Sequence, residues 1–230
     1  MGKSNTAMIL NPFLEGMGEA GAVVDLFYTG ELNINPCIGE FTCLFRTPGK
    51  CYQEDDMQLL YPKMEIADVL VFASPLYAEG VNGPMKNLLD RMLPRTEPFI
   101  ELRDNRCQHT VHKDTKNSKV VLVSNCSLWE LENFDPLVVH MQAFCRNLSF
   151  DYAGALLRPH GMMIKKMIKA DVSVDDVFEA AKDAGRQLIS KGRMEQETLD
   201  VVSRELLPRE KYMQISNGFS RQTLQALQKK

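Results

Sequence analysis

Residues 68–91 constrain the fold of this chain more than any other stretch, because they predict a strand, a loop and a helix in succession. Residues 69–73 form a short, unbroken apolar run, which is typical of a parallel strand covered by helices on both faces. Pro75 ends this strand, and Pro84 presets the backbone for the first turn of the following helix. In open α/β sheets, ligands bind at the carboxyl ends of such strands, so the loop is a candidate binding site.

The same loop resembles a sequence motif of a known family. Ser-Pro-Leu-Tyr at residues 74–77 and Gly-Pro-Met-Lys-Asn-Leu-Leu-Asp-Arg at residues 83–91 resemble the flavin loop of the NAD(P)H-dependent FMN reductases and iron-sulfur flavoproteins. This family is a branch of the flavodoxin-like proteins. The resemblance implies that Pro75, Leu76 and Tyr77 line FMN, with loop N–H groups donating to its isoalloxazine ring. On pattern alone, the segment would be an ordinary connection between a strand and a helix.

The beginning of the chain supplies a second part of the same candidate site. Ser4, Asn5 and Thr6 precede an apolar helical stripe, and either Ser4 or Asn5 can cap that helix. A helix N-terminus also favours an anion, because its first N–H groups have no partner within the helix. In the family, which the chain resembles from Ser4 to about Pro208, a Gly-Ser-Pro-Arg stretch leads into Ser-Asn-Thr and holds the FMN phosphate. The resemblance therefore assigns these three residues to the phosphate, and an ordinary helix cap is the alternative.

A third loop follows the predicted strand at residues 120–123. It contains Ser124, Asn125 and Ser127, and it lies at the same sheet edge as the first loop because parallel strands end together. The resemblance implies that these three side chains contact the isoalloxazine ring or the ribityl chain of FMN. Trp129 either flanks the ring or is a core aromatic residue.

The succession of elements predicts a flavodoxin-like three-layer α/β sandwich with the parallel sheet order 2-1-3-4-5. Residues 22–27 are the expected strand before the one at residues 69–73. Strand 1 is not encoded, because only three residues precede Ser4. A buried five-residue strand contributes roughly 2 kcal/mol per apolar side chain, so its loss is expected to be severe. We expect either that Met1 is an internal methionine of a longer chain or that a partner segment fills the gap by strand addition.

The βα succession ends at Gly192, which predicts two parts. Residues 1–192 form the flavodoxin-like FMN-binding domain, and residues 193–230 form a C-terminal helical arm. The arm comprises a helix at residues 195–206 and a polar tail at residues 212–230 with a weak apolar pattern. The arm either packs against another subunit or is a frayed terminus. Because the family is commonly oligomeric, we expect a homodimer or homotetramer.

Three of the six cysteines lie in one loop. The segment with Cys37, Cys43 and Cys51 resembles the Cys-x2-Cys-x2-Cys-x5-Cys motif of iron-sulfur flavoproteins, but Glu40 stands where the second cysteine belongs. A four-iron cluster normally takes four thiolates, so we do not expect an iron-sulfur cluster or any other metal here. We favour three reduced thiols in a loop that shapes the edge of the flavin pocket.

The other cysteines lie in different contexts. Cys107, with His109 and His112, falls in a polar stretch at residues 101–118, which we interpret as a solvated loop and candidate lid over the flavin rather than a metal site. Cys126 and Cys145 are expected to be small buried apolar residues.

Composition narrows the function. The net charge of −3 provides no broad basic surface for nucleic acid, and no apolar run reaches the ~20 residues of a membrane span. Without a secretory signal pattern, we expect a cytoplasmic protein. The leading hypothesis is an FMN-dependent oxidoreductase that passes electrons from NAD(P)H to a flavin, quinone or protein acceptor. The alternatives are a flavin-carrying electron-transfer module and a scaffold that no longer binds flavin. We name no catalytic residue, because FMN itself performs the chemistry.

Overall fold

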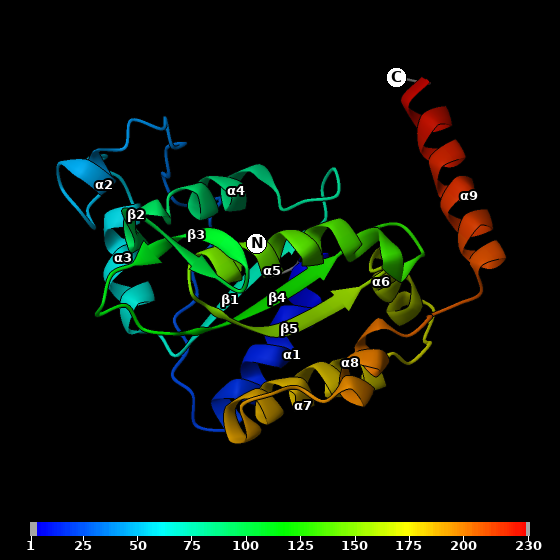
Figure 1. Cartoon of the computed structure of the whole chain (residues 1–230). Helices are drawn as coiled ribbons and strands as arrows, with labels where there is room; N and C mark the ends of the chain where they lie inside the picture. The colour runs from blue at the N-terminus through cyan, green and yellow to red at the C-terminus, as the bar shows by residue number, and fades with distance from the viewer. Residues whose placement is uncertain (1–3, 229–230) are drawn as a thin grey trace.

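The computed structural model describes residues 4–228, in which a parallel sheet lies between two layers of helices (Figure 1). The sheet contains β1 (Val69–Pro75), β4 (Lys119–Asn125) and β5 (Asp151–Arg158), in the order β1-β4-β5. Both pairings are parallel, and Val69 of β1 pairs with Lys119 of β4. This is the 3-4-5 portion of the predicted flavodoxin-like order, which confirms the fold class.

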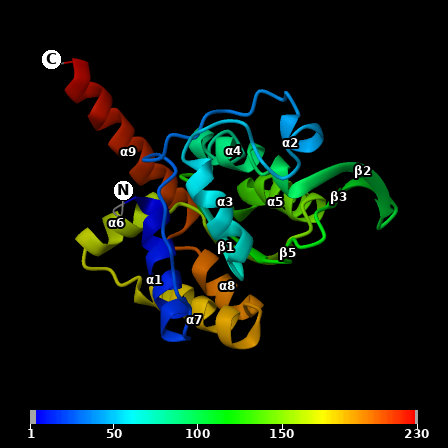
Figure 2. The same ribbon diagram turned by 90° about the vertical axis from the view of Figure 1, so that its left-hand side faces the viewer.

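Helices cover both faces of this sheet (Figures 1 and 2). The helical elements in chain order are α1 (Asn5–Glu19), α2 (Thr42–Phe45), α3 (Met57–Ile66), α4 (Gly83–Asp90), η1 (Leu93–Arg95), η2 (Leu131–Phe134), α5 (Asp135–Asn147), α6 (Met162–Lys169), α7 (Asp175–Lys191), α8 (Gln196–Ser203) and α9 (Arg209–Gln228). None of those within residues 4–228 is long and apolar enough to cross a membrane.

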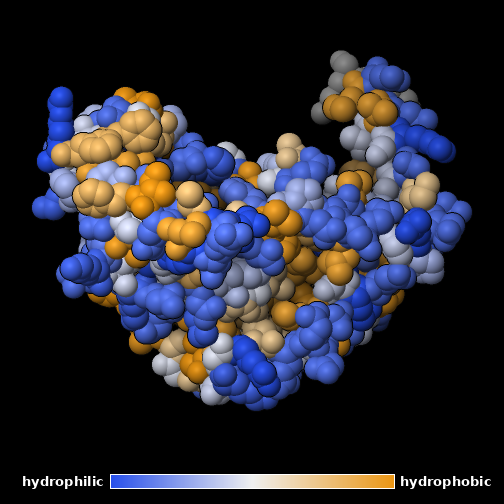
Figure 3. Space-filling model, in the orientation of Figure 1, coloured by the Kyte–Doolittle hydropathy of each residue, from blue (hydrophilic) through white to orange (hydrophobic). Residues whose placement is uncertain are grey.

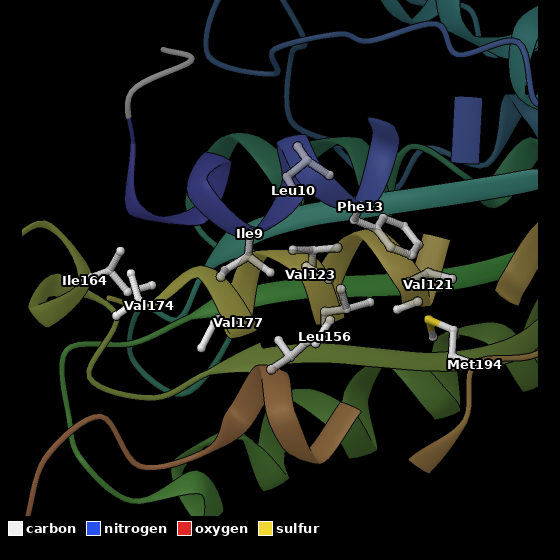
Figure 4. Close-up of a cluster of buried hydrophobic side chains, with 14 of the residues drawn as sticks. Ile9, Leu10, Phe13, Val121, Val123, Leu156, Ile164, Val174, Val177 and Met194 are labelled. Atoms are coloured by element: carbon white, nitrogen blue, oxygen red, sulfur yellow. The ribbon is translucent and has the colours of Figure 1, made fainter. Parts of the chain in front are cut away.

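Side chains alternate between two hydrophobic cores along β4. Val121 and Val123 face α1, α7 and α8, whereas Val120 and Leu122 face α3, α4 and α5. Figure 4 shows the first of these cores, in which side chains of the helices meet those of the sheet: Ile9, Leu10, Phe13, Val121, Val123 and Leu156. All four core residues of β4 are fully buried, because the strand has a neighbour on each side and helices on both faces.

The helices α1 and α7 approach each other closely enough for backbone contact. A Cβ atom added to Gly16 of α1 would lie 1.9 Å from the carbonyl oxygen of Lys182, and one added to Gly185 of α7 would lie 2.1 Å from that of Phe13. Only glycine allows this approach. Pro12 lies inside α1, which runs without a break from Asn5 to Glu19.

Two regions differ from the sequence prediction. Residues 22–27 were expected to be a strand, but they form no strand in the structure and much of the segment is exposed. A strand is stable only when its backbone groups find a neighbour, and within residues 4–228 no segment fills the position between residues 22–27 and β1. The polar stretch that was expected to be a loop is instead an antiparallel hairpin of β2 (Thr96–Arg103) and β3 (Arg106–Val111).

The C-terminal residues differ in burial along their length. Val202 of α8 and Tyr212 at the start of α9 are buried in the first core. The C-terminal portion of α9 extends away from the body (Figure 1), and α9 exposes several apolar side chains (Figure 3). Those side chains are Met213, Phe219, Leu224 and Leu227. The boundary at residue 192 stays a prediction.

Candidate functional site

The three predicted loops meet at the carboxyl ends of β1 and β4, and Asn125 joins them. Thr6 Oγ1 donates a hydrogen bond of 2.5 Å to Asn125 Oδ1, and both side chains are buried. The backbone N–H of Leu76 donates to the carbonyl oxygen of Asn125 at 2.9 Å. One residue therefore holds the start of α1 and the loop after β1 in fixed positions.

The start of α1 presents backbone N–H groups to this place. Ser4 is the N-cap, and its Oγ accepts a hydrogen bond of 3.1 Å from the N–H of Ala7. The cap leaves the backbone N–H groups of Asn5 and Thr6 without a partner within the helix, as at every helix N-terminus. Ser4 thus caps the helix, which was the alternative to a phosphate contact, and the N–H groups beside it suit an anion.

The loop after β1 is held by side chains at its two ends. Ser74 Oγ accepts from the N–H of Asn82 at 3.0 Å, and Asn82 Oδ1 caps α4 by accepting from the N–H of Met85 at 3.3 Å. Between these ends, Tyr77 and Gly80 exchange two backbone hydrogen bonds of 3.0 Å across a two-residue turn. The Tyr77 side chain is left 64% exposed beside the groove described below.

Residues of this turn adopt an uncommon backbone conformation. Ala78 and Glu79 both have positive φ angles, of 46° and 56°. Such angles at both central positions are typical of a type I′ turn and are costly for side chains other than glycine, asparagine or aspartate. The two hydrogen bonds between Tyr77 and Gly80 hold the backbone of this turn.

The predicted residues of the loop after β4 make different contacts. Ser124 is buried, and its Oγ donates to the carbonyl oxygen of Ser74 at 2.8 Å, so it ties the two strand ends together. Ser127 is exposed, and its carbonyl oxygen accepts from the hydroxyl of Tyr212. Trp129 fulfils the core alternative, since its Nε1 donates to Leu207 at 3.0 Å and its ring stacks on His160.

A groove of about 1480 Å³ begins at this site and continues along β1. The predicted residues that line it are Ser4, Asn5, Thr6, Pro75, Leu76, Tyr77, Asn125 and Ser127. Asn82 also lines the groove and was not singled out from the sequence. Its position directly before Gly83-Pro84, the start of a helix, was the available signal.

The cysteine loop is anchored by a buried ion pair that the sequence did not reveal. Arg91 Nη1 lies 2.5 Å from Asp55 Oδ2, and both side chains are buried. Although burial alone would raise the pKa of Asp55, the Arg91 guanidinium holds it below its usual value. Arg91 also donates to the carbonyl oxygen of Asn35 at 2.9 Å, which fixes the chain just before Cys37.

The donor groups of this loop do not match a four-cysteine cluster. Glu40 Oε2 accepts a hydrogen bond of 2.8 Å from the N–H of Thr42, so this carboxylate already has a partner. Cys43 is buried, and burial together with nearby Cys51, Glu40 and Cys37 raises the pKa of its thiol to about 11. Within the described residues, no group of three or more histidine, cysteine, aspartate or glutamate side chains is arranged to hold a metal ion.

The remaining cysteines behave in two ways. Cys126 and Cys145 are buried as predicted, and burial raises the pKa of the Cys145 thiol to about 12. Cys107 is exposed on β3. His109 and His112 instead contact Glu97 of the same region, through its carbonyl oxygen at 3.1 Å and its carboxylate at 3.8 Å.

Comparisons with known proteins agree with this architecture. A family profile of NADPH-dependent FMN reductases matches residues 2–116. An iron-sulfur flavoprotein of Archaeoglobus fulgidus is 37% identical over 90 residues, which are 39% of this chain and 40% of that protein. An iron-sulfur flavoprotein of Methanosarcina thermophila is 31% identical over 87 residues, 38% of this chain and 44% of that protein. The chain thus spans less than half the length of these curated relatives.

A solved structure extends the likeness over more of the chain. The NAD(P)H:quinone oxidoreductase from Methanothermobacter marburgensis has a TM-score of 0.56 at 18% identity, covering 82% of this chain and 90% of that one. The fold and the convergent loops therefore define a flavodoxin-like α/β protein. Since the family profile covers half of the 230 residues, the chain belongs to the NADPH-dependent FMN reductase family.

Proposed function

We propose that this chain is an FMN-dependent oxidoreductase that passes electrons from NAD(P)H to a flavin, quinone or protein acceptor. The observation that carries the proposal is the meeting of three loops at Asn125, through its bonds to Thr6 and Leu76. In a doubly wound sheet this is the place where ligands bind. Family membership supports the choice of FMN as that ligand.

The residues at this place fit FMN. The N–H groups of Asn5 and Thr6, which have no partner within α1, suit a phosphate together with the Ser4 cap, because the donors and the helix dipole both favour negative charge. The exposed Tyr77 ring and the backbone of Pro75 and Leu76 provide a flat apolar surface for a ring system. When bound, FMN supplies the hydride and electron transfer, and the chain's task is to position it and exclude water.

Flavin absorbance tests the proposal directly. Purified protein is titrated with FMN, and NADPH is then added without oxygen. We expect saturable binding followed by loss of the oxidised flavin absorbance. Binding without reduction by NADPH or NADH would contradict the reductase, and failure to bind FMN would contradict the whole proposal.

A matched pair of variants locates the site. Tyr77→Ala should weaken FMN binding about 2- to 10-fold, because stacking of aromatic rings contributes about 0.5–1.5 kcal/mol. Tyr52→Ala is the control, since Tyr52 is also half exposed but lies in the cysteine loop. Equal affinities of the two variants would place the ring elsewhere.

A flavin-carrying electron-transfer module is the second candidate. It is favoured by the similarity to iron-sulfur flavoproteins and by the cysteine loop that resembles their motif. Flavin that is reduced by a reduced protein donor, and not by NADPH, would select this candidate.

We further propose that the chain carries no iron-sulfur cluster. Iron close to four atoms per chain in anaerobically purified protein, lost in Cys43→Ala, would overturn that statement.

We also propose that residues 193–230 act as an oligomer contact in a homodimer or homotetramer. The exposed apolar side chains of α9 support this, because exposed apolar stripes on helices are typical of interaction sites. Light scattering at micromolar concentration should give a multiple of the 26.1 kDa chain mass. A monomer mass would contradict it. A cytoplasmic location stays an expectation from the sequence.

A further inference from the structure

The loop after β4 is held by residues that lie outside it. Three consecutive carbonyl oxygens of this loop, those of Ser127, Leu128 and Trp129, each face a nitrogen or oxygen of another segment. The hydroxyl of Tyr212 donates to the first. The backbone N–H of His160 donates to the second at 2.7 Å, and its ring Nδ1 lies 3.3 Å from the third. These bonds favour one conformation of the loop over the others that a flexible segment could adopt.

Residues 204–212, which lead from α8 into the first turn of α9, are tied to the same loop. His160 bridges the two segments, because its Nε2 accepts from the N–H of Leu206 at 2.9 Å while its Nδ1 faces the loop. Trp129 of the loop donates directly from Nε1 to the carbonyl oxygen of Leu207 at 3.0 Å. The loop and residues 204–212 therefore form one hydrogen-bonded unit.

Three aromatic rings pack in a row within this unit. The ring centres of Trp129 and His160 lie 6.1 Å apart, and those of His160 and Tyr212 lie 5.9 Å apart. Tyr212 is only 8% exposed, and its side chain belongs to the first core. Because the core fixes the Tyr212 ring, it also determines where the Tyr212 hydroxyl lies, and the loop takes the position that this donor allows.

The loop also borders the candidate flavin site. Asn125 and Ser127 line the groove, whereas Tyr212 does not. Asn125 holds the other two parts of the site through its bonds to Thr6 and Leu76. A displacement of this loop therefore changes the arrangement of all three parts, although the residues that hold it lie outside the groove.

We propose that Tyr212 is a positioning residue of the flavin site, whose hydroxyl holds the loop after β4 in the conformation that binds FMN. Tyr212 acts through the backbone of Ser127 and does not itself contact the flavin. The effect is reciprocal, so FMN binding also stabilises the packing of residues 204–212 against the loop by the same factor. The inference rests on the FMN site proposed above.

A pair of tyrosine variants tests the positioning role. Tyr212→Phe keeps the ring in the core and removes only the hydroxyl. Tyr61→Phe is the matched control, since the Tyr61 hydroxyl also donates to a backbone carbonyl oxygen, that of Arg91 at 2.7 Å, and packs against the other core. Calorimetric titration gives the FMN dissociation constants. We expect Tyr212→Phe to weaken FMN binding about 2- to 10-fold, the factor that one hydrogen bond contributes, and Tyr61→Phe to leave it unchanged.

The outcomes separate this inference from the proposed function. Wild-type protein that binds no FMN would contradict the proposed function and the positioning role together. Wild-type protein that binds FMN, with equal affinities of the two variants, would overturn the positioning role alone.

Amide hydrogen exchange gives a second readout, one that a general loss of stability does not move. In wild-type protein, saturating FMN should slow the exchange of the Leu206 N–H about 2- to 10-fold more than that of the Thr198 N–H, because the coupling is reciprocal. Thr198 is the control, since its N–H bonds to Glu195 within the same region of the chain and not to His160. In Tyr212→Phe the extra slowing at Leu206 should disappear. Equal slowing of both amides in wild-type protein would overturn the proposal without any variant.

Discussion

Strands β4 and β1 have similar apolar sequences but different surroundings. Residues 120–123 of β4 are fully buried, with a paired strand on each side. In β1, Leu70 and Phe72 are buried whereas Val69, Val71 and Ala73 are only half-buried beside the groove. An apolar run therefore predicts that a segment is a strand but not how many neighbours it has. Residues 22–27 show the same point, since this apolar segment forms no strand where residues 4–228 give it no strand neighbour.

The largest difference between these regions should appear in cavity-forming substitutions. Leu122→Ala in β4 should lower the free energy of unfolding by about 2–5 kcal/mol, because Leu122 is completely buried. Leu26→Ala should change the free energy of unfolding by less than about 0.5 kcal/mol, since Leu26 is 45% exposed where residues 22–27 line the groove. Urea unfolding measures both. A large effect of Leu26→Ala would mean that residues 22–27 close onto β1 in solution.

Two glycine substitutions in α1, the helix that lines one wall of the groove, test its close contact with α7. Gly16→Ala should destabilise the protein by about 1–3 kcal/mol, because the added Cβ would meet the carbonyl oxygen of Lys182. Gly18→Ala, on the same helix with open space around it, should be neutral or stabilise by up to about 1 kcal/mol. Thermal unfolding compares the two. Equal effects would contradict the close helix crossing.

The stability of the folded chain should also depend on pH, through the buried His160 that follows β5. Its Nε2 accepts from the N–H of Leu206 at 2.9 Å, and its Nδ1 lies 3.3 Å from the carbonyl oxygen of Trp129. Burial, with the charge of Arg158 nearby, lowers the pKa of His160 to about 4. The folded state therefore holds the neutral ring, with Nδ1 as the donor.

The sign of the effect follows from this lowered pKa. Below the usual pKa of about 6.5 the unfolded chain takes up a proton that the folded chain refuses, so stability is full above pH 6.5 and falls as the pH approaches 4. Between pH 7 and pH 5.5 the free energy of unfolding should drop by about 1 kcal/mol from this group. His160→Gln should remove that drop in urea unfolding followed by the fluorescence of Trp129, the single tryptophan. A drop of the same size in the variant would assign it to other groups.

The smallest effect on stability is expected in α9. Phe219→Ala should change the free energy of unfolding by less than about 0.5 kcal/mol, because the side chain is exposed and its ring pairs with Lys166, whose Nζ lies 4.7 Å from the ring centre. The same substitution should weaken self-association of the chain in sedimentation or light scattering. Unchanged association would argue against the arm as an oligomer contact.

Much of the candidate site could be predicted from the sequence, because its parts are local. The loop after β1, the cap at Ser4 and the loop at Asn125 each follow from short motifs at strand or helix ends, and the sheet brings them together. The burial of Cys126 and Cys145 followed from helix and strand patterns.

Other features depend on contacts between distant residues and were not predictable. The hairpin of β2 and β3 was hidden because its two buried residues, Thr96 and Gln108, are polar, whereas apolar Phe99, Ile100 and Leu102 are exposed. Its sequence therefore lacks the alternation of buried apolar and exposed polar residues that marks a strand. The ion pair of Arg91 with Asp55 joins residues 36 positions apart, and nothing local to either indicates it. Residues 22–27 form no strand because no other segment of residues 4–228 pairs with them, and the sequence of residues 22–27 does not itself reveal this.

Amide hydrogen exchange, resolved by residue with NMR, tests the half-paired state of β1 most directly. In the free protein, Leu70 and Phe72 should exchange slowly because their N–H groups bond to β4, whereas Val71 and Ala73 should exchange fast because theirs face the groove. All of residues 120–123 in β4 should exchange slowly. Protection of Val71 and Ala73 equal to that of β4 would show that β1 is already paired on both edges, and it would contradict the open groove.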